Sequence, residues 1–111
     1  MKTILSLSAL LITLTLTAQT NTATWYLNDT SGNGIQSNNN TASGGFTTAM
    51  GDSTEASGNT STAMGFDTTA SADYSTAMGY YTTASVNYST AMGWVTKASG
   101  VVSTAMGQST E

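Results

Sequence analysis

The stretch that decides the fold is STAMGFDTTASADY, residues 61–74, which is one copy of a regular repeat. Its Thr-Ala-Met-Gly motif occurs five times, and each copy lies 14 residues from the next. The motif methionines are Met50, Met64, Met78, Met92 and Met106. The motif glycines, at which the turns are expected to begin, are Gly51, Gly65, Gly79, Gly93 and Gly107. An Ala-Ser pair and a threonine recur with the same period. A phase kept over five copies predicts one stacked structural unit per repeat.

The length of the period selects the kind of unit. Fourteen residues are too few for a helix-turn-helix repeat, which needs about 30 or more. Two heptads would also give this length, but the motif glycines would then lie inside a helix, at about 1 kcal/mol each relative to alanine. The a and d positions of such a coiled coil would not both be apolar. The pattern therefore predicts an all-β solenoid, with strands over residues 61–65 and 68–72 and turns at 65–67 and 73–74.

The alternation of side chains along each strand predicts a thin roll. Thr62 and Met64 should point to one side of the first strand, and the other side carries only small residues. The second strand also offers a row of small residues: Thr68, Ala70 and Ala72. Equivalent residues of stacked coils lie about 4.8 Å apart, so the methionines form a ladder. Because a thin roll buries little and the chain lacks Cys, we expect copies of it to associate through this ladder.

The N-terminal segment has the layout of a secretory signal peptide. Lys2 gives a positive start, and a mostly apolar stretch over residues 4–16 precedes small residues. That stretch has about 13 residues, fewer than the roughly 20 needed to span a bilayer. We therefore expect a signal peptide over 1–18, and no membrane span in the chain after its removal. Residues 19–39 are expected to form a cap or degenerate first coil, in which Trp25 to Leu27 is a strand or end cap. The repeats then occupy 40–111 and are expected to be truncated mid-repeat.

The composition excludes several classes of function. The chain has no His and no Cys, so the commonest general base and the usual thiolate metal site are missing. Lys2 and Lys97 are the only basic residues against six acidic ones, too few to neutralise the phosphates of a nucleic acid. Asp67 and Asp73 lie in no Asp-rich, glycine-containing calcium loop. We expect no catalytic residues, cofactor, metal ion or nucleic-acid partner.

The repeat resembles the head repeat of trimeric autotransporter adhesins of the YadA-like class. That repeat runs approximately Ser-Val-Ala-Ile-Gly, two variable residues, then Ser-X-Ala-X-Gly. Ala63, Gly65 and Ala70 match it identically. Thr62 and Met64 replace its usual Val and Ile, and Thr replaces Ser at position 68. The final glycine is kept in some copies and replaced in others, as by alanine at position 72.

The resemblance implies a left-handed parallel β-roll that assembles as a homotrimer. It also implies an exported protein of the bacterial cell surface, the outer membrane or the extracellular space. The leading hypothesis is a non-enzymatic adhesin head that binds extracellular matrix or a cell-surface ligand. The alternative is a structural spacer, a fibre segment presenting a further C-terminal domain that this chain lacks.

Aromatic residues after the motif glycines are the candidate surface contacts. Phe66, Tyr80 and Trp94 should stack along one edge, either as a ligand-contacting stripe or as turn packing or trimer contact. Tyr74 and Tyr88 form a second pair, which cross-strand aromatic packing explains. The threonine columns also suggest an ice-binding array, but methionine shares the threonine face of the motif strand, which disfavours it.

Overall fold

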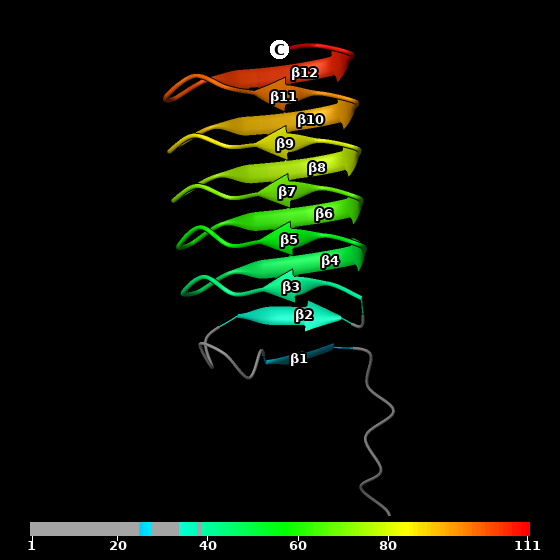
Figure 1. The fold of residues 1–111 in the computed structure, drawn as a ribbon, viewed down its shortest axis with the longest axis vertical. Coiled ribbons are helices and arrows are strands. Elements are labelled where there is room, and N and C mark those ends of the chain that lie inside the picture. The colour runs from blue at the N-terminus through cyan, green and yellow to red at the C-terminus, as the bar shows by residue number, and fades with distance from the viewer. Residues whose placement is uncertain (1–24, 28–33, 38) are drawn as a thin grey trace, which may run out of the picture.

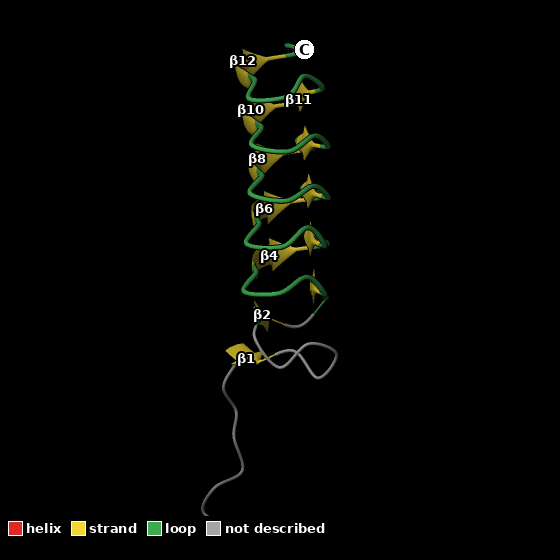
Figure 2. Ribbon diagram, turned by 90° about the vertical axis from the view of Figure 1, so that its left-hand side faces the viewer, coloured by secondary structure: helices red, strands yellow, loops and turns green. Residues whose placement is uncertain are grey.

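The chain forms a column of stacked coils, each made from one long and one short strand (Figure 1). The computed structural model describes residues 25–27, 34–37 and 39–111. A seven-stranded sheet has the order β1 (Trp25–Leu27), β2 (Ile35–Ser37), β4 (Thr48–Asp52), β6 (Thr62–Phe66), β8 (Thr76–Tyr80), β10 (Thr90–Trp94) and β12 (Thr104–Gln108). A five-stranded sheet has the order β11 (Lys97–Ala98), β9 (Thr83–Ala84), β7 (Thr69–Ala70), β5 (Glu55–Ala56) and β3 (Thr41–Ala42). The two sheets face each other as thin layers (Figure 2), and no described residue is helical. The expected all-β solenoid is confirmed.

Strand pairing keeps the repeats in register. Neighbouring long strands are parallel, and each residue pairs with its equivalent 14 positions away, as Met64 does with Met50 and Met78. β1 departs from this pattern, because it runs antiparallel to β2 with Trp25 opposite Ser37. It therefore lies at the N-terminal end of the seven-stranded sheet. The expected signal peptide, over 1–18, lies outside the described residues.

The strand boundaries differ slightly from those expected from the sequence. The first strand of the quoted repeat is Thr62–Phe66, one residue later than expected, and the second is only Thr69–Ala70. The reason is the position of the turns. Asp67 has a positive φ of 49°, which ends the first strand after Phe66 rather than before it. Ala72 already belongs to the bend that leads to Tyr74, so the second strand ends early.

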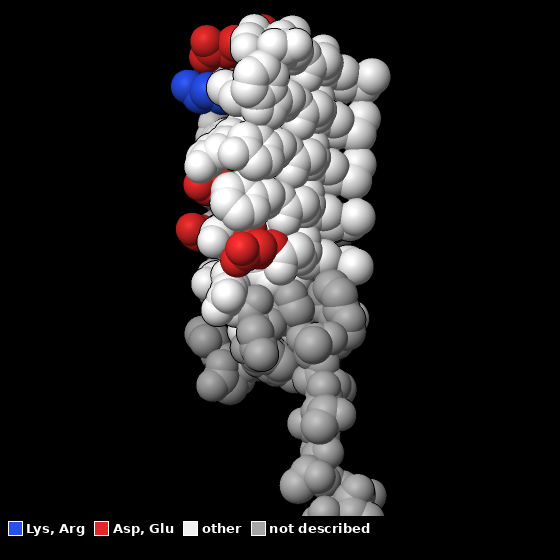
Figure 3. Space-filling model, turned by 90° about the vertical axis from the view of Figure 1, so that its right-hand side faces the viewer, with Lys and Arg blue, Asp and Glu red and all other residues white. Residues whose placement is uncertain are grey.

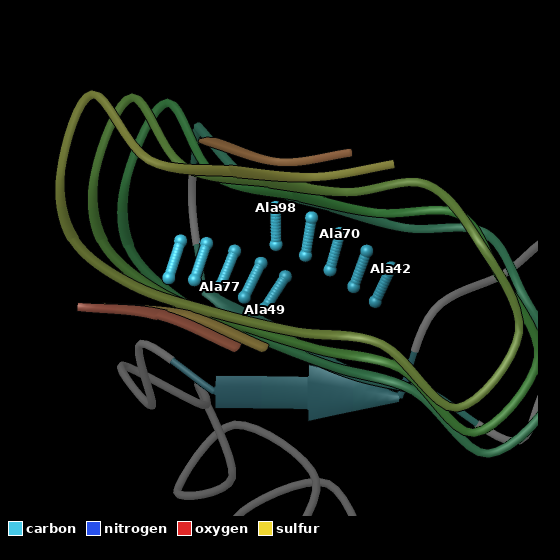
Figure 4. Close-up of a cluster of buried hydrophobic side chains, with 10 residues drawn as sticks. Ala42, Ala49, Ala70, Ala77 and Ala98 are labelled. Atoms are coloured by element: carbon cyan, nitrogen blue, oxygen red, sulfur yellow. The ribbon is translucent and has the colours of Figure 1, made fainter. Parts of the chain in front are cut away.

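The interior of the roll is a double row of alanines. Nine of them are at most 1 % exposed: Ala42, Ala49, Ala56, Ala63, Ala70, Ala77, Ala84, Ala91 and Ala98. Figure 4 shows the alanines of the two sheets pointing towards one another across a narrow gap. A methyl group is the largest apolar side chain that this gap holds. The expectation of small, inward-facing residues is therefore confirmed.

Hydroxyl side chains flank the alanines inside the roll. At one end of four coils a hydroxyl donates to the carbonyl three residues earlier, as from Ser61 to Gly58 at 2.7 Å and from Ser75 to Ala72 at 2.6 Å. The equivalent Ser89 hydroxyl is buried without a hydrogen bond. At the other end lies a column of buried threonines. The lowest of these, Thr54, donates from Oγ1 to the side-chain oxygen Oδ1 of Asn40 at 2.6 Å and from its backbone N–H to the same atom at 2.9 Å. Asn40 thus satisfies the first threonine of the column.

The threonines above Thr54 have no such partner. The Oγ1 atoms of Thr68, Thr82 and Thr96 are buried without a hydrogen bond. We therefore expect Thr82→Val, which keeps the shape and removes the hydroxyl, to be neutral or to stabilise the roll by about 1 kcal/mol. Thr54→Val should instead cost about 1 to 2 kcal/mol, because it leaves the Asn40 oxygen without its hydroxyl donor. Urea unfolding of the two variants measures the difference, and equal destabilisation would contradict the assignment.

Each coil turns through residues in a left-handed backbone conformation. One turn column comprises Asn39, Ser53, Asp67, Tyr81, Val95 and Ser109, with φ between 49° and 64°. The other comprises Phe46, Thr60, Tyr74, Tyr88 and Val102, with φ between 55° and 61°. Both columns place their side chains on the narrow edges of the roll, and most of these side chains are exposed.

Candidate interaction surfaces

The outer side of the seven-stranded sheet is a flat face built from two residue types. We call it the Thr/Met face, and its members are Thr48, Thr62, Thr76, Thr90, Thr104, Met50, Met64, Met78, Met92 and Met106. Within each strand these residues alternate with the buried alanines, so they point away from the interior. The methionines of β4 to β10 are half-buried, and Met106 in the last coil is 58 % exposed. The methionines thus form a ladder on the outside of the roll, and the alanines alone fill its apolar interior.

The motif glycines allow the coils to approach each other closely. Each is the fourth residue of a five-residue strand, one position before the strand end, rather than in the turn itself. Gly51, Gly65, Gly79 and Gly93 have φ between 126° and 130°. A Cβ on any of these four would overlap the carbonyl oxygen of the glycine in the next coil. Glycine is therefore required there by its conformation and by lack of space.

The edge formed by the turns after the long strands carries a cluster of large apolar side chains. We call it the aromatic edge, and its members are Phe66, Tyr80, Tyr81, Trp94 and Val95, each 39–47 % exposed. Phe66 and Tyr80 stack with ring centroids 5.2 Å apart. Tyr81 meets both rings edge to face, at 5.8 Å from Phe66 and 4.5 Å from Tyr80. Trp94 is the strand partner of Tyr80 in the coil above.

Two members of this cluster were not singled out from the sequence. Tyr81 and Val95 follow Tyr80 and Trp94 directly, at the turn position equivalent to Asp67, and the sequence did not indicate the direction of their side chains. The left-handed conformation of both residues, with φ of 53° and 52°, turns them onto the same edge. Bulky side chains are disfavoured in that conformation, at about 1 to 2 kcal/mol per residue. An aromatic pair contributes about 0.5 to 1.5 kcal/mol, so ring packing roughly cancels the conformational cost at Tyr81.

The charges near the aromatic edge are mostly negative. Figure 3 shows this edge, where acidic groups and one basic group interrupt a largely uncharged surface. Lys97, the only basic residue of the described chain, pairs with Glu111 at 3.4 Å. The neighbouring Tyr80 raises the pKa of the Tyr81 phenol above its ordinary value, with smaller contributions from desolvation and from Asp67. Asp52 lies in the strand beside Phe66, as its register partner.

The opposite edge carries a second aromatic pair. Tyr74 and Tyr88 stack with ring centroids 5.0 Å apart and planes within 4° of parallel. They are 53 % and 55 % exposed, Val102 lies in the coil above them, and Thr60 separates them from Phe46 in the coils below. Stacking between equivalent residues of successive coils, as expected from the sequence, accounts for this pair.

The described residues offer no grouping of the kind that metal sites need. Nowhere in residues 25–27, 34–37 and 39–111 do three His, Cys, Asp or Glu side chains gather in a way that could hold a metal ion. The same part of the chain contains no helix long and apolar enough to cross a membrane.

The repeated part of the chain matches the model of a known family. A family model that describes two copies of the YadA head domain repeat matches residues 42–68, 56–82, 70–96 and 84–110. Together these matches cover more than half of the chain. The chain belongs to the YadA head family. No curated protein and no solved structure matches it significantly. YadA-type heads are trimeric adhesin modules exposed at the cell surface, and membership implies that the chain is exported.

Proposed function

We propose that this chain is the head segment of a non-enzymatic bacterial adhesin, displayed on the outer membrane or secreted, which attaches to host matrix or to cells. We further propose that it works as a homotrimer. The observation that carries the proposal is the Thr/Met face, because no described part of the single chain covers it. Its half-buried methionine ladder runs the length of a roll from a family whose heads are trimeric.

The thin interior of the roll supports the proposed association. It contains methyl and hydroxyl groups and no large apolar side chain, so little apolar area is removed from water per residue. Small folds with so thin a core generally need disulfides, metals or oligomerisation. The chain has no Cys, and its described part holds no metal-binding group. Burying three Thr/Met faces against one another supplies the missing apolar burial.

The chemistry of the Thr/Met face suits a closed interface. None of its members is charged, and burying unpaired charges is the main obstacle to association of a surface. Methionine is flexible and adapts to a symmetric contact in which equivalent side chains meet around an axis. The strict in-register pairing keeps the methionines in one straight row from Met50 to Met106.

Met78→Lys tests the proposed contact. Three ammonium groups would meet in an interface without a partner charge, so we expect the trimer to dissociate with a dissociation constant raised at least 100-fold, or about 2.7 kcal/mol. Sedimentation equilibrium measures the mass of the assembly formed by the wild-type chain and by the variant, each without the expected signal peptide. Ser71→Lys is the control, because this exposed residue follows β7 in the short-strand layer, away from the Thr/Met face. A stable monomer before any substitution would refute the trimer.

Adhesion requires its own measurement. The trimeric chain is expected to bind at least one member of a panel of matrix proteins and cultured cells in a surface-attachment assay. The alternative role, a spacer that only holds another domain at a distance, is favoured by the regularity of the coils. If the folded trimer binds nothing in the panel, the spacer role stands in place of adhesion.

A further inference from the structure

The fold does not require the residues of the aromatic edge. The same two turn positions are polar in other coils of the same roll. Where Phe66, Tyr80 and Trp94 stand, the first and last long strands have Asp52 and Gln108. The position of Tyr81 and Val95 is occupied elsewhere by Ser53, Asp67 and Ser109, all in the same left-handed conformation. The coil is therefore built equally well with short polar side chains at this edge.

The aromatic edge is also placed against the backbone preference of its residues. Tyr81 and Val95 occupy a conformation that bulky and β-branched side chains disfavour. At Tyr81, ring packing only offsets the cost of this backbone conformation. Val95 has no ring, so nothing of this kind offsets the cost there. Tyr74, Tyr88 and Val102 on the opposite edge have the same conformation, so composition is what distinguishes the aromatic edge. An exposed cluster of Tyr and Trp is the composition that protein interfaces favour.

The charges around the cluster indicate which partner it fits. Asp52 and Asp67 lie next to Phe66, one as its strand partner and one as the following residue. Lys97 is paired with Glu111 and offers no free positive charge. The whole chain has a net charge of −4. Aromatic faces attract cations, and an arginine guanidinium both stacks on a ring and donates hydrogen bonds to a carboxylate.

We propose that the aromatic edge binds an arginine-bearing, cationic protein segment. Guanidinium groups stack on the rings of Tyr80, Tyr81 and Trp94, and Asp67 and Asp52 accept hydrogen bonds from them. This inference rests on the proposed adhesive function and names the partner chemistry of one edge. It is independent of the Thr/Met face, which lies on a different side of the roll.

Substitutions taken from the chain's own repeat test the proposal without disturbing the fold. The double variant Tyr81→Ser, Trp94→Gln introduces the residues that the last coil has at the equivalent positions. Ser109 is the equivalent of Tyr81, and Gln108 is the equivalent of Trp94. Neither change alters the net charge, so general attraction between opposite charges is kept. We expect the wild-type trimer to bind a synthetic Gly-Arg repeat peptide in isothermal titration calorimetry at low salt. The double variant should bind it about 10-fold more weakly.

Controls separate the rings of this edge from other effects. Tyr74→Thr with Tyr88→Thr removes the aromatic pair of the opposite edge and restores the residue found at position 60. This control should keep wild-type affinity. No binding of the Gly-Arg peptide, or equal loss in both double variants, overturns the proposal. A change of the Tyr81/Trp94 variant from trimer to monomer also overturns it, since the edge would then be a subunit contact. The adhesin proposal is judged separately, by the mass of the Met78→Lys variant and the attachment panel.

Discussion

Replacing Gly79 with alanine is expected to break the solenoid at its centre. The new Cβ would overlap the carbonyl oxygen of Gly93 in the coil above. To relieve this overlap, β8 and β10 must separate, and the ladder between them is lost. The backbone at φ 126° adds a cost of about 1 to 3 kcal/mol for any residue with a side chain. We expect Gly79→Ala to destabilise the roll by more than about 4 kcal/mol, which is exceptional for a single substitution.

The last motif glycine provides a matched control. Gly107 has nearly the same backbone conformation, with φ 119°, but a Cβ there would meet only Thr110 Cγ2 at 3.7 Å, an ordinary contact. Gly107→Ala should therefore cost only the conformational part, about 1 to 3 kcal/mol. Thermal unfolding followed by far-ultraviolet circular dichroism compares the two variants. If both lose equal stability, the close approach of the coils at Gly79 is not what selects glycine.

Most of the fold could be predicted from the sequence, because equivalent residues of successive repeats share one structural environment. Alternation within the motif was enough to separate inward Ala63 from outward Met64, and both assignments agree with the structure. The stacking of equivalent positions followed from the constant period. Asn40 illustrates a feature that could also have been found. It lies one period before Thr54 and forms the base of that buried column.

The turns could not be predicted with the same accuracy, for a conformational reason. Left-handed backbone positions are usually marked by Gly, Asn or Asp, and the turn columns use Tyr81, Tyr88 and Val95 as well. The repeat placed these positions in turns, but local propensity gave no signal that Tyr81 and Val95 lie on the same edge as Tyr80 and Trp94. The aromatic edge was in consequence underestimated, and the second strand was expected to extend too far, to Ala72 rather than Ala70. Stacking on neighbouring coils overrides the preference of the single residue here.

Ala77→Leu is expected to have the second large effect, because the two sheets are held apart by methyl groups alone. Ala77 is fully buried in β8 and points towards the alanines of the short strands. Three further carbon atoms have no space there. Overpacking of a core commonly costs about 1 to 3 kcal/mol, and we expect the upper end or more. Parallel ladders hold the coils around β8 in both sheets, so the sheets cannot move apart at one coil alone.

An outward position on the other sheet separates this effect from a general intolerance of leucine. Thr83 precedes buried Ala84 in the short strand β9, and its side chain points outward, away from the Thr/Met face. Thr83→Leu should change the stability of the chain by less than about 1 kcal/mol, as outward substitutions usually do. Urea unfolding curves of the two variants give the comparison. If Ala77→Leu were as well tolerated as Thr83→Leu, the sheets would have room to separate. The thin core could then not be the reason why this roll needs copies of itself.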